Sequence, residues 1–317
     1  MDSLIVERIL ARLGRPDLVN ILANDLSNSE LNSVLMDVFS RKTGQLSPPE
    51  LLKSYRSNRF VSPADIDVLG LRELENTVYV TFNQLGFTPV ELSPVAPLGS
   101  CSVVATADQN KILSANRNTE VMADATNALA LYIADLKHSG AWQYQSPTDR
   151  LHMSTIHRHL RTPPVPKLPG FRPHFKIACL VTSGKDTGSY QFEKEALSEH
   201  IAATTALFRE RLGINKLAFR LLPRKGYPDP VALVQLLRDY VGQQHEQVAV
   251  KAATDTVGDN NYYKGLQYKI DIEVAGQTIE IGDGGFVDWT QQLLQNKKER
   301  LLTTGIGIEL LYRLLAN

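Results

Sequence analysis

The stretch that says most about the fold closes the chain and reads Gly305-Ile306-Gly307-Ile308-Glu309-Leu310-Leu311-Tyr312-Arg313-Leu314-Leu315-Ala316-Asn317. It predicts the end of a strand, two spaced glycines and then an apolar helix. Glycines at such a place let the backbone approach a ligand or a neighbouring element closely. Taken alone, the pattern is more typical of tight packing where a helix begins, so its meaning depends on the rest of the chain.

The composition is that of a globular protein without a strong charge preference. The chain has 317 residues, 43% of them hydrophobic, and Lys+Arg and Asp+Glu total 34 each. This length is enough to bury the core of one large domain or two smaller ones. No basic tail or lysine-arginine block indicates nucleic-acid binding.

The sequence also lacks the patterns of metal sites and membrane segments. Cys101 and Cys179 lie in apolar segments without metal-ligand spacing, so we expect buried free thiols. His157 and His159 alternate with Arg158, which places both histidines on one face of a strand and the arginine on the other. They have no third ligand in sequence, so we expect no metal. Without a long apolar run or a signal pattern, we expect a cytoplasmic protein with no membrane contact.

Residues 1–62 are predicted to form a small all-helical N-terminal unit. Apolar residues recur at helical spacing through the first thirteen residues. Ser27 with Glu30, and Ser47 with Glu50, form capping boxes at the start of two further helices. Residues 63–317 would then form the main domain.

Residues 63–317 predict an α+β fold with an antiparallel sheet flanked by helices, because hairpins and helices are interspersed rather than strictly alternating. We predict helices at residues 69–85, 126–136, 191–212, 230–241 and 288–294, and strands at residues 87–92, 111–115, 151–159, 174–182, 217–222, 268–274 and 278–281. The proline-rich residues 163–170 are predicted to form a loop. Lys297-Lys298-Glu299-Arg300 is expected to be a solvated run.

Seven segments in order resemble the catalytic core of class II aminoacyl-tRNA synthetases, and of histidyl-tRNA synthetases in particular. Residues 87–94 resemble motif 1, residues 156–161 resemble motif 2, and the closing Gly-x-Gly-x-Glu resembles motif 3. Between them, residues 115–120, 174–179, 263–268 and 282–288 resemble other conserved segments of that family. The resemblance covers about residues 70–317 and includes no C-terminal anticodon-binding domain.

The resemblance implies a role for particular residues. Arg158 matches the motif 2 arginine on the ATP α-phosphate, and it would be catalytic only if the protein is active. Phe175 matches the aromatic ring under adenine. The nucleotide and Mg²⁺ site would further include Gly284, Gly285, Gly305, Gly307 and Arg313. The implied substrate-binding residues are Arg117, Thr119, Glu120, Lys264 and Tyr268.

Several positions depart from the family pattern in the same direction. Leu160 replaces the motif 2 glutamate, and Leu310 replaces the motif 3 arginine that binds the γ-phosphate. Neutral residues also replace carboxylates at Thr119, Val181 and Gln267. A pocket that has exchanged acids for neutral groups no longer favours a cationic amine or imidazolium, which argues against histidine as the ligand.

These departures favour a catalytically degenerate, histidyl-tRNA-synthetase-like protein that binds an amino acid, a nucleotide or a partner protein in a regulatory role. The ATP phosphoribosyltransferase regulatory subunit is a protein of this kind. The alternative is an active adenylate-forming ligase that uses ATP and a carboxylate substrate other than histidine. A third hypothesis is that the N-terminal helices bind a partner protein. The motif 1 resemblance implies a homodimer, and the absent anticodon-binding domain makes tRNA an unexpected ligand.

Overall fold

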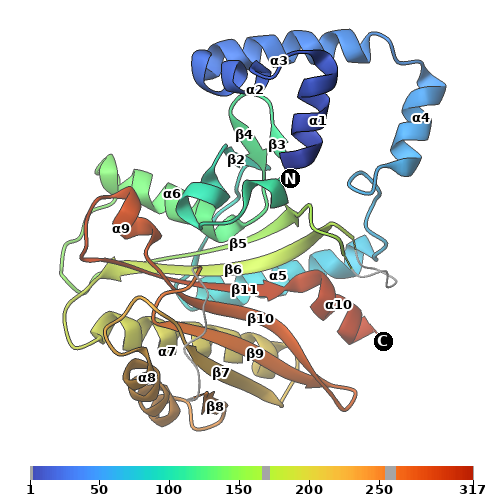
Figure 1. The fold of residues 1–317 in the computed structure, drawn as a ribbon. Coiled ribbons are helices and arrows are strands. Elements are labelled where there is room, and N and C mark those ends of the chain that lie inside the picture. Colours follow the sequence, from blue (N-terminus) through green and yellow to red (C-terminus); the bar gives the residue numbers. More distant parts are fainter. Residues whose placement is uncertain (1–2, 166–171, 254–261, 317) are drawn as a thin grey trace.

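The computed structural model describes residues 3–165, 172–253 and 262–316, and Figure 1 shows their arrangement. Its centre is an eight-stranded sheet in the order β1-β5-β6-β11-β10-β9-β7-β8. The strands of this sheet are β1 (Thr88–Pro89), β5 (Leu151–Leu160), β6 (His174–Lys185), β7 (Leu217–Pro223), β8 (Ala249–Ala252), β9 (Leu266–Val274), β10 (Gln277–Val287) and β11 (Glu299–Gly307). All neighbours pair antiparallel except β1 with β5 and β7 with β8.

Helices cover both faces of the large sheet. One face carries α5 (Val68–Gln84), α7 (Gln191–Thr205), α8 (Pro230–Gln244) and α10 (Ile308–Ala316), and the other carries α6 (Ala125–His138) and α9 (Trp289–Leu293). A small sheet of β2 (Val95–Pro97), β4 (Thr119–Val121) and β3 (Ser114–Ala115) lies on the side of α6. The α+β fold with an antiparallel sheet flanked by helices is therefore confirmed.

Alternation along the central strands separates two hydrophobic cores. On β6, Ala178 and Leu180 pack into the core under α5 and α7, whereas Cys179 and Val181 pack on the side of α6. Successive side chains of a strand point to opposite faces, so each strand contributes to both cores. Buried area on both faces explains why the sheet strands are long and apolar.

The N-terminal segment consists of helices, as the capping boxes predicted. They are α1 (Ser3–Leu13), α2 (Leu18–Asn20), α3 (Asn28–Thr43) and α4 (Pro48–Ser57), with a π-helical turn at Ile21–Asp25. Both capping boxes are present, at Ser27 with Glu30 and at Ser47 with Glu50. No helix in the described part of the chain is long and apolar enough to cross a membrane.

The strand and helix predictions hold for the long elements and fail for several short ones. Of residues 87–92 only Thr88 and Pro89 pair, and of residues 111–115 only Ser114 and Ala115 do. The helix predicted over residues 191–212 becomes a π-helix at Ala206–Arg211. Strand β8 was not predicted. Part of the predicted loop at residues 163–170 lies outside the described residues.

The prediction of a solvated run at residues 297–300 is wrong for Glu299. Its side chain is only 3% exposed and pairs with Lys137 Nζ at 2.6 Å, where Lys137 is 6% exposed. The Lys137 ammonium also donates to Tyr144 Oη and Ser183 Oγ. Burial lowers the pKa of Lys137, although the Glu299 carboxylate opposes this shift. The chain thus contains a buried ion pair between α6 and the start of β11.

Breaking this pair from one side should cost much stability. Lys137→Met leaves the Glu299 carboxylate buried without a cation, so we expect the free energy of unfolding to fall by about 3 kcal/mol or more. Lys137→Met combined with Glu299→Leu should recover most of that loss, because neither charge then remains buried. Urea unfolding of the three proteins measures both effects. A single variant as stable as the parent would show that the pair is not buried in solution.

Candidate functional site

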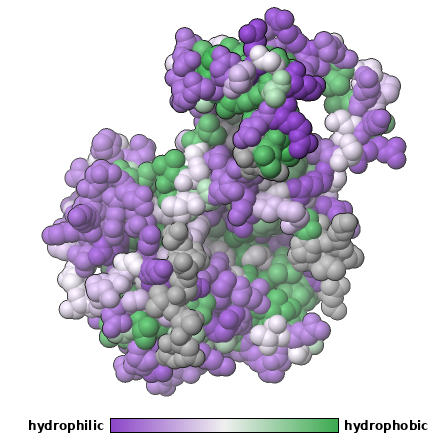
Figure 2. All heavy atoms as spheres, viewed as in Figure 1, coloured by the Kyte–Doolittle hydropathy of each residue, from purple (hydrophilic) through white to green (hydrophobic). Residues whose placement is uncertain are grey.

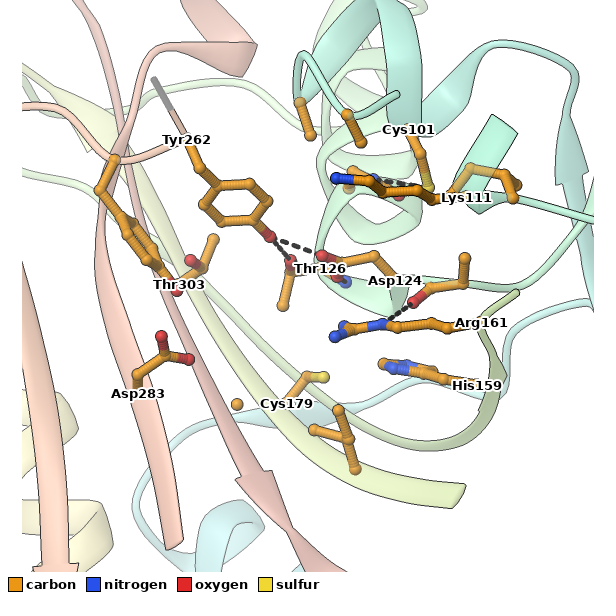
Figure 3. A pocket seen from close by; sticks show the side chains of 18 of the residues that line it. Cys101, Lys111, Asp124, Thr126, His159, Arg161, Cys179, Tyr262, Asp283 and Thr303 are labelled. Carbon is orange, nitrogen blue, oxygen red and sulfur yellow. Dashed lines mark hydrogen bonds between the residues drawn. The ribbon is translucent and has the colours of Figure 1, made fainter. Parts of the chain in front are cut away.

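A cavity of about 420 Å³ lies on the side of the large sheet that carries α6 (Figure 3). Strand β6 supplies its floor through Ile177 and Cys179, and β11 through Thr303 and Gly305. Lining residues from outside the strands include Cys101, Lys111, Asp124, Thr126, Arg161, Tyr262 and Tyr263. The cavity therefore joins segments that are far apart in the sequence.

Two acidic and two basic side chains line this cavity. Asp124 and Asp283 are the acids, and Lys111 and Arg161 are the bases. Asp283 accepts a hydrogen bond from Gln267 Nε2 at 2.8 Å, and Figure 3 shows its carboxylate pointing into the cavity. A closed space with both signs of charge suits a ligand that itself carries both signs.

Asp124 begins α6 and also faces the cavity. Its Oδ1 accepts from the Thr126 amide at 2.9 Å and from Thr126 Oγ1 at 2.7 Å, while its Oδ2 accepts from Tyr262 Oη at 2.5 Å. Burial alone would raise the pKa of Asp124, but the Arg161 charge and these hydrogen bonds outweigh burial and keep the pKa below its ordinary value. The carboxylate therefore stays ionised at neutral pH. Asp124 is thus both the N-cap of α6 and part of the cavity lining.

Arg161 follows β5 and offers unused hydrogen-bond donors to the cavity. Its Nε donates to the Ala123 carbonyl at 3.2 Å, and the guanidinium lies 5.5 Å from the centre of the Phe175 ring. Within the described residues, its two terminal nitrogens donate no hydrogen bond. A planar guanidinium with two free nitrogens is the group best shaped to bind a carboxylate or phosphate.

His159 is a buried neutral histidine beside Arg161. Its Nε2 accepts a hydrogen bond from the Ala125 amide at 3.1 Å, so the neutral ring carries its proton on Nδ1. Burial lowers the pKa of His159 to about 3, against the opposing effect of Asp124. Among the described residues, Nδ1 has no hydrogen-bond partner.

A second cavity of about 480 Å³ adjoins the first and shares Arg161, Ile177, Asp283 and Gly305 with it. It lies where β11 passes into α10. Its lining includes Phe175 and, from the closing segment of the chain, Gly305, Gly307, Leu310 and Arg313. A Cβ at Gly305 would lie 3.4 Å from Ile177 Cγ2, so the missing side chain leaves room at the boundary of the two cavities.

Comparison with known proteins shows which known fold the chain resembles. No protein-family model and no curated protein matches the sequence. Among solved structures, the chain is similar to an ATP phosphoribosyltransferase regulatory subunit/histidyl-tRNA synthetase from Bacillus halodurans C, with a TM-score of 0.60 and 13% identity over 81% of this chain and 83% of that one. This chain has a class II aminoacyl-tRNA synthetase-like core.

Two further solved structures support the same fold. The histidyl-tRNA synthetase of S. aureus matches 77% of this chain with a TM-score of 0.56 and 11% identity, and this chain covers 65% of its length. A putative threonyl-tRNA synthetase from Aeropyrum pernix matches 78% with a TM-score of 0.56 and 12% identity, and 58% of its length is covered. At these identities the likeness shows the fold alone.

In this class II synthetase-like core, Arg158 does not line either cavity. It lies on the opposite face of β5, where Nη2 pairs with Glu309 Oε1 at 2.5 Å and Nη1 lies 2.9 Å from His174 Nδ1. The two-residue period of the strand sends His159, and Arg161 after it, to the face of the first cavity instead. Glu309, the partner of Arg158, lines the second cavity, and the contact of Arg158 with a nucleotide stays a prediction.

The segment at residues 115–120 supports the cavity from outside rather than lining it. Glu120 is buried, and its carboxylate accepts hydrogen bonds from the Gly99 and Cys101 amides, both at 2.9 Å. Thr119 Oγ1 donates to the Asn116 carbonyl, and the Arg117 amide donates to Asn32. Arg117, Thr119 and Glu120 thus do not line the first cavity, and their predicted substrate contacts stay a prediction. Glu120 positions the loop that carries Cys101.

The other predicted substrate residues, Lys264 and Tyr268, also lie outside the cavity lining. Tyr268 is fully buried on the far face of the sheet, where its hydroxyl pairs with Thr304 Oγ1. Lys264 Nζ lies 3.6 Å from Asp288 Oδ2. Their neighbours Tyr263 and Gln267 line the cavity instead. Here too the alternation of β9 decides which side chain reaches the site.

Gly284 and Gly285 make room for neighbouring side chains. A Cβ at Gly284 would lie 2.5 Å from Tyr268 Cζ, and one at Gly285 would lie 2.6 Å from Tyr263 Cδ1. Any larger residue would have to displace these rings. Gly305 and Gly307 line the second cavity, whereas the nucleotide contacts of Gly284 and Gly285 stay a prediction.

The sequence analysis gave no role to Lys111 and Asp283, and it placed Arg161 in the segment that resembles motif 2 without a role of its own. Contrary to the prediction of a pocket that had lost its acids, Asp124 and Asp283 supply two carboxylates. The sequence did contain a signal for both acids. Asp283 stands between Gly282 and Gly284, and Asp124 stands just before a predicted helix.

The buried His159 should make stability depend on pH. Its folded pKa of about 3 lies below the ordinary value of 6.5, so between these values the unfolded chain binds a proton that the folded chain does not. The free energy of unfolding should therefore be complete above about pH 6.5 and fall on acidification by up to about 1.4 kcal/mol per pH unit. Urea unfolding at pH 7, 6 and 5 measures the slope.

His159→Gln should flatten that slope, because the variant keeps an acceptor for the Ala125 amide and does not titrate. His138→Gln, at the exposed end of α6, serves as the control for the loss of one histidine. Equal slopes for the parent and His159→Gln would show that His159 is protonated normally in the folded protein.

Proposed function

We propose that this class II synthetase-like protein binds an amino acid or a similar small zwitterion and acts in a regulatory role without aminoacylation. The observation that carries the proposal is the lining of the first cavity by Asp124 and Asp283 together with Arg161 and Lys111. An ammonium group pairs with the acids, and a carboxylate pairs with the terminal nitrogens of Arg161.

The size and closure of the cavity support a small ligand. A volume of about 420 Å³ lies within the range of pockets for small molecules. Tyr262, Tyr263 and Ile177 provide apolar surface beside the charged groups, which leaves a side chain of the ligand something to pack against. The structural neighbour from Bacillus halodurans C, whose name includes a regulatory subunit, supports the regulatory role by analogy of fold.

The second cavity supports the absence of adenylate formation. Leu310 lines it where the resemblance predicts an arginine for the γ-phosphate, and Arg158 is paired with Glu309, which lines the same cavity. Arg313 also lines the cavity but donates to the Asp65 carbonyl. Adenylate formation depends on charge placed accurately at the phosphates, so these positions favour binding over catalysis.

Binding should depend on Arg161. With a panel of the twenty amino acids in a thermal-shift screen, a ligand of the native state raises the melting temperature, and calorimetry then gives its affinity. We expect Arg161→Gln to weaken the ligand so found by at least 30-fold, because the charge-assisted pair with its carboxylate is lost. Asp283→Asn should weaken it through the ammonium.

Arg158→Gln is the matched control, because it removes the same group from the opposite face of the same strand region. Calorimetry is carried out well below the melting temperature of each variant, so that the cost of unpairing Glu309 does not enter. An equal loss of affinity in both arginine variants, or no response to any amino acid, would refute the proposed site.

The second candidate function is an adenylate-forming ligase with ATP, Mg²⁺ and a carboxylate substrate other than histidine. Phe175, Arg172 and Arg313 line the second cavity, and an aromatic ring with guanidinium groups suits a base and phosphates. Bound ATP would supply the activating phosphate. In the described part of the chain, no group of three or more His, Cys, Asp or Glu residues could hold a metal ion.

Amino-acid-dependent exchange of pyrophosphate into ATP separates the two functions. We expect no exchange above background at saturating concentrations of the ligand found by calorimetry, because Leu310 cannot replace the lost charge. Exchange that Arg161→Gln abolishes would favour the ligase and overturn the regulatory proposal. We further propose a homodimer through residues 87–94 and action together with a partner protein rather than tRNA, on the strength of the same fold analogy.

A further inference from the structure

The N-terminal helices contain no hydrophobic core of their own. We define the N-terminal arm as residues 3–62, which include α1 to α4. No described side chain of α2, α3 or α4 is buried, and among the described residues the first buried one is Leu71. Short helices are marginal in water without tertiary packing of an apolar face. The arm therefore needs a surface that the single chain does not supply.

The arm exposes large apolar side chains at a density found nowhere else in the described chain. Fourteen of them are 40–60% exposed. They are Leu4, Ile5, Ile9, Leu13, Val19, Val34, Met36, Val38, Phe39, Leu46, Leu51, Leu52, Tyr55 and Val61. Figure 2 shows apolar side chains among the polar ones over this part of the molecule. So many exposed apolar side chains in one segment are typical of an interaction site.

Polar contacts attach the arm to the core and leave its apolar side chains uncovered. Asn32 accepts from the Arg117 amide at 2.8 Å and donates to Asn118 Oδ1 at 2.8 Å. At the other end, Arg59 donates to the carbonyls of Thr162 and Pro163. Figure 1 shows α4 standing away from the sheet. The position of the arm is thus held by hydrogen bonds and not by burial of its helices.

We propose that the arm is an interface with a second copy of this chain, in which the arms of two protomers cover each other. At roughly 50 Å² of apolar surface each, the fourteen side chains expose about 700 Å². Each partner of a stable interface contributes about 800 Å². A twofold contact buries the same patch on both chains, so the arm alone provides nearly the area that such a contact requires.

The charge of the arm favours a second copy over a charged partner. Residues 1–62 carry eight basic and seven acidic side chains, so the segment has a net charge of +1. Binding to nucleic acid or to an anionic membrane needs a clear basic excess, which this segment lacks. Two nearly neutral arms meet without net repulsion. The contact is separate from the one proposed at residues 87–94.

Substitutions in the helix α4 test the proposed interface most directly. Tyr55 lies four residues after Leu51 and three after Leu52, so its side chain neighbours both on the surface of the helix. The double variant Leu51→Lys and Leu52→Lys keeps good helix formers and places like charges where the two arms would meet. Val231→Lys with Leu236→Lys is the matched control, because both are exposed apolar residues of α8, far from the arm.

Light scattering after size-exclusion chromatography of the full chain tests the proposal. We expect the parent and the α8 control to form assemblies of the same mass. The α4 variant should form a smaller assembly, and its dissociation constant for the larger one should be at least 100-fold higher by analytical ultracentrifugation. Thermal unfolding of the α4 variant should keep the transition of the core, since no buried residue is altered. A monomeric parent, or an α4 variant that assembles like the control, overturns the proposal.

A cross-link reports the contact directly. Ser54→Cys lies on α4, and the native Cys101 and Cys179 are buried. A short bifunctional thiol reagent should join two chains through position 54, and Gln243→Cys on α8 should remain unlinked under the same conditions. Equal linking at both positions, or none at position 54, contradicts an interface between arms and would direct attention to a different protein as the partner.

Discussion

The pairing of β5 with β6 is the constraint on which the site depends. Because side chains alternate along a strand, this register sends His159 and the following Arg161 to the cavity and sends Arg158 to Glu309 on the other face. A shift of one residue would exchange the two sets and place Arg158 in the cavity. Burial on both faces prevents such a shift, since it would also move the apolar side chains of both cores.

Around this register, one carboxylate connects the helix, the strand and the loop of the site. Asp124 accepts from the free Thr126 amide at the start of α6, is stabilised as an anion by Arg161, and accepts from Tyr262. A group with three structural partners is held in one orientation, which favours binding of a ligand without rearrangement. At the far end of α6, the buried ion pair of Lys137 and Glu299 holds the helix against β11 in the same way.

Long elements could be predicted from the sequence, whereas short strands and individual contacts could not. Capping boxes and helical periodicity are local signals, and they located α3, α4, α6 and α8 closely. Strands β1 and β3 have two residues each, and neither has a periodic pattern long enough to predict it; β1 exists because the distant β5 pairs with it, and β3 because β4 does. Glu299 stands in a run of four charged residues, yet the path of β11 buries it, and no local pattern reports that.

The sequence by itself determined the order of the class II motifs, the α+β class and the loss of the motif 3 arginine, because these depend on residue identity and spacing. Only the tertiary structure decided which residues form the cavity. Asp124, Arg161 and Asp283 lie far apart in the chain and meet because the sheet register, the start of α6 and the β10–β11 pairing bring them together. The strand period is visible in sequence, but which face becomes the site is settled only when helices cover the sheet.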